Sequence, residues 1–172
     1  MHNVQQLAVA LAIIVAAASS TPPQLFLQSC NSTLVGVWET VELENGIPLA
    51  TAKVAVFKSI PFAQPPVGDL RFRSPVDLLC PPTTTSDIID ATHFGDVCAQ
   101  VGPMPWDKMT GSEDCLTLTV HVPEWILSDR NASSDGWPIL NYIYGGDLTF
   151  GSEREPMSFF AANTPPPSTT VS

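Results

Sequence analysis

Residues 138–152 read PILNYIYGGDLTFGS, and this stretch decides the fold prediction. Its first seven residues form a short apolar run that is typical of a strand, and the run ends at Gly145 and Gly146. Paired glycines allow the backbone to turn sharply at that point. Functional loops of α/β proteins follow the ends of strands, so we expect a site at this turn. The alternative is that the two glycines only terminate a strand.

Three further segments upstream of this stretch have strand character. Residues 34–43 (LVGVWETVEL) are followed by the turn signal Asn45-Gly46 and then by residues 54–60 (VAVFKSI), which predicts an antiparallel hairpin at the edge of a sheet. Residues 116–122 (LTLTVHV) alternate apolar and polar side chains, which predicts another strand. Between them, the proline-rich but apolar residues 61–75 are expected to form a loop packed against the body of the protein.

Composition and charge narrow the function classes. The 172 residues include 44% hydrophobic and 14% charged residues, a globular balance that suits one domain, and the 17 prolines favour few helices. The net charge is −10, and the seven Lys and Arg residues are scattered along the chain. A nucleic-acid surface needs basic residues gathered on one face, so nucleic acid is excluded as a partner.

The two ends of the chain differ in composition from the middle. Residues 1–20 contain the run LAVALAIIVAAA, which is typical of a signal peptide and too short for a helix that crosses a bilayer. We therefore expect a secreted, extracellular protein with no stable membrane span, although a retained anchor is the alternative. Residues 164–172 (TPPPSTTVS) are expected to form a disordered tail.

Four cysteines would then meet an oxidising compartment, where disulfides are the rule. No C-x-x-C pair and no histidine at ligand spacing is present, so we expect no metal site and no cofactor. Asn31 and Asn131 each begin an N-x-Ser/Thr tripeptide, which predicts two N-glycosylation sites.

Four segments, in this order, resemble the type-B carboxylesterase/lipase family, which includes the cholinesterases. They are residues 57–72 (FKSIPFAQPPVGDLRF), 94–100 (FGDVCAQ), 112–116 (SEDCL) and 138–152. Ser59 departs from the pattern, because the family usually has Gly there. The resemblance covers residues 34–163 and looks most like fungal secreted members.

This resemblance implies an α/β fold, specifically the N-terminal part of an α/β-hydrolase over residues 21–163: the hairpin plus the first strands of the central mixed sheet. It stops abruptly after Asn163, where a family member would continue toward its nucleophile. We therefore expect an incomplete domain.

The resemblance also assigns roles to individual residues. The backbone N–H groups of Gly146 and Asp147 would form half of an oxyanion hole, and Cys98 would pair with Cys115. Arg71 and Glu113 would form a structural, partly buried bidentate ion pair. Trp106, near a position where cholinesterases keep an aromatic residue, is interpreted as a packing residue. Cys30 and Cys80 remain, and they either pair with each other or stay free.

Ester hydrolysis in this fold requires a serine within G-x-S-x-G, a histidine base and an acidic residue. No G-x-S-x-G occurs in the 172 residues, so no catalytic residue is assigned. His93 and His121 are interpreted as surface or structural residues. A carboxylic ester would be a substrate only of a full-length domain, and the chain as given should be inactive. The alternatives are a non-catalytic secreted binding module of the same fold and a fragment without function.

Overall fold

The computed structural model describes residues 21–43, 50–80, 87–102, 108–128, 137–147 and 149–164. Several sequence predictions fall outside these ranges: the signal peptide, the Asn45-Gly46 turn, Trp106, Asn131 and residues 165–172.

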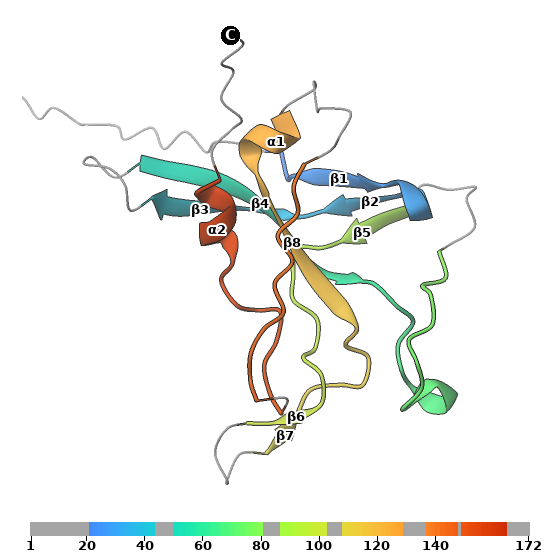
Figure 1. Ribbon diagram of the computed structural model, residues 1–172. Helices are drawn as coiled ribbons and strands as arrows, with labels where there is room; N and C mark the ends of the chain where they lie inside the picture. Colours follow the sequence, from blue (N-terminus) through green and yellow to red (C-terminus); the bar gives the residue numbers. More distant parts are fainter. Residues whose placement is uncertain are drawn as a thin grey trace, which may run out of the picture.

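The larger sheet consists of β3 (Val37–Leu43), β4 (Ala50–Pro61) and β8 (Thr117–Pro123), with β4 in the middle (Figure 1). Both pairings are antiparallel, and Val56 faces Val37 on one side and His121 on the other. Residues 54–57 on the central strand are fully buried. The predicted hairpin and the predicted strand near residues 116–122 are thus confirmed.

The smaller sheet has the order β1 (Gln24–Leu27), β2 (Ser32–Val35), β5 (Asp87–Asp90). The 3₁₀ turn η1 (Gln28–Cys30) joins β1 to its antiparallel neighbour β2, whereas β5 runs parallel to β2.

Gly36 divides the single strand that was predicted over residues 34–43 into β2 and β3. A Cβ at Gly36 would lie 2.4 Å from the carbonyl oxygen of Val56 and 2.8 Å from the Phe57 ring. Because no side chain fits there, the chain can pass closely over β4 and change sheets. The two sheets then share one core, made of Leu34, Ala55, Phe57, Ile60 and Ala91.

The proline-rich loop departs from its prediction. It contains η2 (Gly68–Leu70) and extends away from the sheets (Figure 1). Ala63 is buried, but Phe62 is 51% exposed and Phe72 is 98% exposed. The expectation that the loop packs closely on the body is therefore wrong for most of its apolar side chains. The described residues provide no surface that covers them.

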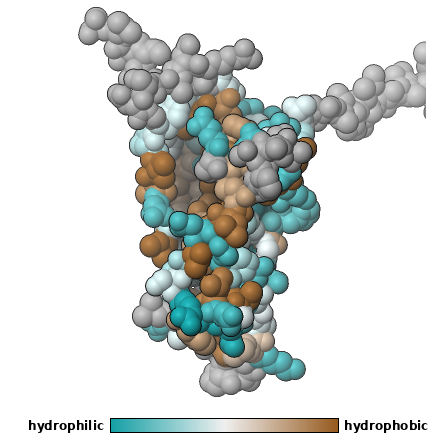
Figure 2. Space-filling view, turned by 90° about the vertical axis from the view of Figure 1, so that its right-hand side faces the viewer, coloured by the Kyte–Doolittle hydropathy of each residue, from teal (hydrophilic) through white to brown (hydrophobic). Residues whose placement is uncertain are grey.

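Residues 138–144 do not form the predicted strand. A strand requires the backbone groups of a neighbour, and these residues belong to no sheet among the described residues. Their apolar side chains are left outside: Ile139 is 92% exposed and Ile143 is 83% exposed. Apolar patches of this kind alternate with polar ones over the face seen in Figure 2.

The described residues also form two α-helices of five residues each, α1 (Glu124–Ser128) and α2 (Ser158–Ala162). α2 packs on the larger sheet, in contact with β3, β4 and β8. Neither helix has the length or the apolar character needed to cross a bilayer, and none of the described segments contains one that does. At the opposite end, β6 (Gln100–Val101) pairs with β7 (Met109–Thr110) near the disulfide between Cys98 and Cys115 (Figure 1).

Candidate functional site

The candidate site is the glycine turn, which we define as residues 145–147 and 149–151. Gly146 has φ +126°, and a Cβ there would lie 1.7 Å from the carbonyl oxygen of Phe150. The Gly146 carbonyl accepts hydrogen bonds from the backbone N–H groups of Thr149 at 3.0 Å and Phe150 at 3.1 Å. The chain folds back on itself so tightly that only glycine fits at this position.

Gly146 and Asp147 present two free donors. Within the part of the chain that the structure describes, neither backbone N–H has a hydrogen-bond acceptor. Asp147 has φ +59°, a left-handed conformation that Asp tolerates better than most residues, and its side chain is exposed. Successive N–H groups in such a turn form a concavity that favours an anion.

The glycine turn lines a hollow of about 460 Å³. Its other wall comes from Cys98, Ala99 and Gln100, in the loop closed by the Cys98–Cys115 disulfide. The residues that the sequence assigned to the oxyanion hole and to this disulfide are therefore brought together.

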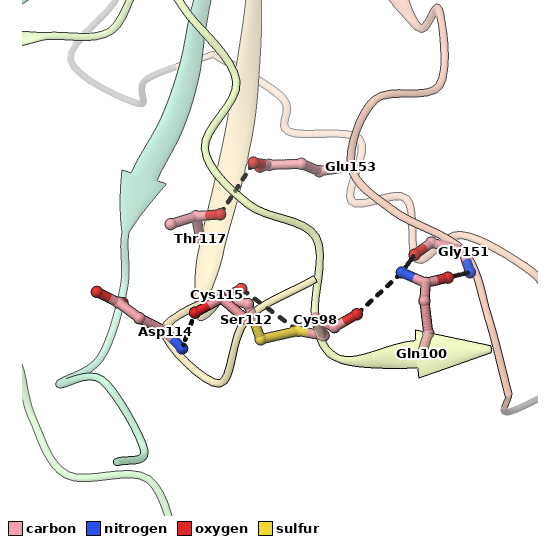
Figure 3. Close-up of a disulfide and its surroundings, with 8 residues drawn as sticks. All are labelled: Cys98, Gln100, Ser112, Asp114, Cys115, Thr117, Gly151 and Glu153. Atoms are coloured by element: carbon pink, nitrogen blue, oxygen red, sulfur yellow. Dashed lines mark hydrogen bonds between the residues drawn. A yellow bond between two sulfur atoms is a disulfide. The ribbon is translucent and has the colours of Figure 1, made fainter. Parts of the chain in front are cut away.

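Gln100 joins the two walls through its side-chain amide (Figure 3). Its Oε1 accepts a hydrogen bond of 2.7 Å from the Gly151 N–H, and its Nε2 donates to the Gly151 carbonyl at 3.0 Å. Nε2 also donates to the Cys98 carbonyl at 3.0 Å. Sequence reasoning assigned no role to Gln100, although it lies in one of the four segments that carry the resemblance.

Glu153 connects the glycine turn to the larger sheet. Its Oε1 accepts hydrogen bonds from the hydroxyls of Ser59 at 2.7 Å and Thr117 at 2.9 Å, and its Oε2 accepts one from Thr119 at 3.0 Å. Three hydroxyl donors from β4 and β8 thus satisfy one half-buried carboxylate (Figure 3 shows the bond to Thr117). No sequence pattern indicated a role for Glu153, because its partners come from two distant strands.

Ser59 lies in an irregularity of β4, where the register with β8 shifts between Phe57 and Ile60. Its φ is +52°, which explains why glycine suits this position. The serine compensates with two contacts: it donates to Glu153, and it accepts a 2.6 Å hydrogen bond from the Gly95 N–H.

Both cysteine pairs are joined in the structure. Cys98 bonds to Cys115 across a sequence separation of 17, and Cys30 bonds to Cys80 across a separation of 50. The question that the sequence left open for Cys30 and Cys80 is answered by their proximity in the fold. Asn31, which follows Cys30, is half-buried and has φ 47° at the end of η1.

Arg71 and Glu113 are in contact, but not in the form expected. Arg71 Nε lies 2.5 Å from Glu113 Oε1, a single contact rather than a bidentate one, and the two side chains are 51% and 42% exposed. The predicted ion pair is thus present, but it has one hydrogen-bonded contact instead of the two of a bidentate pair. An exposed pair of this kind contributes about 0–1 kcal/mol.

His121 belongs to a cluster under α2. The hydroxyl of Ser158, which is 5% exposed, donates its one hydrogen to Glu39, so the 2.9 Å contact with His121 Nδ1 requires that this nitrogen carry the hydrogen. Burial lowers the pKa of His121, although the Glu39 carboxylate opposes this and Lys58 adds to it. These contacts serve the docking of α2 on the sheet.

Two further titratable side chains, His93 and Tyr142, lie within hydrogen-bonding distance of another side chain. His93 is exposed and its Nδ1 lies 2.6 Å from the Thr92 hydroxyl. The hydrogen bond from the Tyr142 hydroxyl to Glu155, 2.7 Å long, raises the pKa of this phenol above its usual value. No group of three or more His, Cys, Asp or Glu side chains among the described ranges is placed to hold a metal ion.

Three relatives of this chain are esterases or ester hydrolases. A carboxylic ester hydrolase of Bombus ignitus is 38% identical over 104 residues, covering 58% of this chain and 17% of the relative. Para-nitrobenzyl esterase of Bacillus subtilis (strain 168) is 34% identical, covering 59% and 19%. Juvenile hormone esterase of Heliothis virescens is 32% identical, covering 74% and 23%. The chain therefore spans about a fifth of the length of these relatives.

A solved structure agrees with this result. The crystal structure of juvenile hormone esterase from Manduca sexta, with OTFP covalently attached, superposes with a TM-score of 0.51 at 30% identity. The match covers 69% of this chain and 20% of that one, which confirms the N-terminal part of an α/β-hydrolase fold. The model of the Carboxylesterase family matches residues 42–163, well over half of the chain. The protein is therefore a member of the carboxylesterase family.

Proposed function

We propose that this chain forms the N-terminal portion of a carboxylic ester hydrolase. It supplies two of the N–H donors that bind the carbonyl oxygen of the ester, which are part of the oxyanion hole. The observation that carries the proposal is the pair of N–H groups on Gly146 and Asp147, which have no acceptor among the described residues and lie beside a hollow of about 460 Å³. An ester carbonyl placed over them would direct its oxygen at two donors.

The N–H groups of Gly146 and Asp147 would act in one step, the attack on the ester carbonyl. When a serine oxygen attacks the ester carbon, the carbonyl π pair moves to the oxygen, which becomes an anion. Each preorganised N–H that meets this oxyanion stabilises the transition state by about 3 kcal/mol. The attacking serine belongs to a G-x-S-x-G segment, which the 172 residues do not contain.

Asp147 modifies this function through its charge. Its backbone donor is unaffected by the side chain, but a carboxylate close to the forming oxyanion opposes the negative charge. The exposed position of the Asp147 side chain keeps the carboxylate in solvent, where the opposition is weakest.

The first experiment is to sequence the transcript beyond the codon for Asn163. Continuation into a G-x-S-x-G segment would support the proposal, and the longer product should hydrolyse short-chain nitrophenyl esters. Replacement of that serine by alanine should abolish the activity. The 172-residue chain, assayed in parallel, should give no turnover above a matched blank. A transcript that stops at Ser172 would refute the catalytic role for this product.

We propose in addition that the protein is secreted and glycosylated. The apolar run in residues 1–20, the two disulfides, and the tripeptides at Asn31 and Asn131 support this location. N-terminal sequencing of protein from the culture medium should begin after Ala18 or Ser20. Enzymatic removal of N-glycans should increase its mobility on a gel.

A non-catalytic binding module is the second candidate, and the exposure of Ile139, Leu140 and Ile143 is the observation that favours it. Light scattering of the purified 172-residue chain distinguishes a binding module from an incomplete hydrolase domain. A monodisperse product would favour a binding module, whereas aggregation would indicate that these side chains require the remainder of a sheet.

A further inference from the structure

We infer that Gln100 is the positioning residue of the glycine turn: its side-chain amide holds Gly151, and through Gly151 it sets the direction of the Gly146 and Asp147 N–H groups. This inference rests on the proposed function, because it explains how that oxyanion hole is kept in shape.

The contact between Gln100 and Gly151 has the pattern of a β-ladder pair. The side-chain amide offers one acceptor and one donor, and it uses both on the backbone of a single residue, at 2.7 Å and 3.0 Å. These bonds are half-buried, where a hydrogen bond contributes more than it does in water. Gly151 belongs to no strand, so Gln100 replaces the neighbouring strand that it lacks.

Gly151 controls the shape of the turn because it lies against the start of it. Its φ is +125°, and a Cβ there would lie 2.5 Å from the carbonyl oxygen of Gly145. Gly145 and Gly151 are thus in close approach, and Gly146 and Asp147 are held between them. Fixing Gly151 therefore limits rotation of the peptide units whose N–H groups form the site.

Gln100 can act as an anchor because its own backbone is fixed. The Cys98–Cys115 disulfide closes its loop, and Gln100 faces Thr110 in the β6–β7 pair. The Ala99 N–H also donates to the Ser112 carbonyl at 3.0 Å. The disulfide and the β6–β7 pair thus hold the segment around Gln100, and the Gln100 amide links this segment to the glycine turn.

The test uses the 172-residue chain labelled with ¹⁵N, and its readout is the amide signals of Gly146, Asp147 and Gly151. In Gln100→Ala, hydrogen exchange at Gly151 should be faster by about tenfold or more, since the hydrogen bond that the Gly151 N–H donates to Gln100 Oε1 is removed. The Gly146 and Asp147 signals should shift, while Val56 and Phe57 in the buried β4 strand should stay protected. Protected β4 amides show that the variant is folded.

Gln100→Glu gives a sharper test because it can be rescued by pH. An ionised carboxylate faces the Cys98 and Gly151 carbonyl oxygens without a donor, so the turn should loosen at neutral pH. A protonated carboxyl has one donor and one acceptor, so it can restore the pairing with Gly151. The wild-type signals of Gly146 and Asp147 should return as the pH falls below the pKa of the new carboxyl.

Gln64→Glu is the matched control. The Gln64 amide also donates to a backbone carbonyl, that of Asp77 at 3.0 Å, but in the proline-rich loop. This change should leave the three reporter signals at their wild-type positions at every pH. If Gln100→Glu behaves like Gln64→Glu, or if low pH does not restore its signals, the inference is refuted. The readout needs no turnover, so it fails or succeeds independently of the esterase proposal.

Discussion

A Cβ placed on Gly146 would lie 1.7 Å from the carbonyl oxygen of Phe150, closer than any side chain can approach. The turn that carries these two N–H groups, neither with an acceptor in the described part of the chain, therefore requires glycine at this position. A Cβ placed on the neighbouring Gly145 would have no heavy atom within 4 Å. An alanine substitution at Gly146 therefore tests the turn, and the same substitution at Gly145 is its control.

Gly146→Ala should open the turn and destabilise the chain by about 1–3 kcal/mol, the range for a residue forced into a strained conformation. Gly145→Ala should change the free energy of unfolding by less than about 1 kcal/mol. Urea unfolding of both variants measures the difference. In a longer product that hydrolyses esters, Gly146→Ala should also lower kcat by about 10²–10³. Equal losses for the two variants would contradict the geometry.

Ser59 balances an unfavourable backbone conformation against two hydrogen bonds. Ser59→Ala keeps φ at +52° and loses the contacts with Glu153 and Gly95, whereas Ser59→Gly loses the contacts but relieves the backbone. We expect Ser59→Ala to cost about 1 kcal/mol more than Ser59→Gly in the free energy of unfolding. Denaturant titrations of the two variants and the wild type test this order, and a more stable alanine variant would contradict it.

The lowered pKa of His121 predicts a pH dependence of stability. Because burial disfavours the charged imidazole, the unfolded chain binds a proton more readily than the folded chain does. The stability should be complete above the unfolded pKa of about 6.5 and should fall as the pH decreases through that value toward the folded pKa. Urea midpoints between pH 7.5 and 5.5 measure the slope.

His121→Asn should remove most of this slope and also weaken the docking of α2, since the bond to Ser158 changes. The same substitution at the exposed His93 should leave the slope in place. A slope that survives in His121→Asn would assign the pH dependence to another group.

Local sequence patterns determined the elements that need only near neighbours. Alternation and the Asn45-Gly46 signal predicted the β3–β4 hairpin and β8, because a period of two and a turn-favouring dipeptide can be read from the local sequence. The paired glycines likewise located the turn, and the four motif segments indicated the family.

Tertiary structure decided everything that depends on a partner distant in the chain. Residues 138–144 have a strand pattern but no strand neighbour among the described residues, so their backbone groups make no ladder. The pairing of Cys30 with Cys80 depends on η1 lying near the end of the proline-rich loop. Gln100 and Glu153 acquire their roles from Gly151 and from β4 and β8, which are 34 to 94 residues away from them in sequence. A periodic pattern in the sequence indicates which face of a strand or helix is buried. A hydrogen bond between two loops depends instead on where the whole fold places those loops.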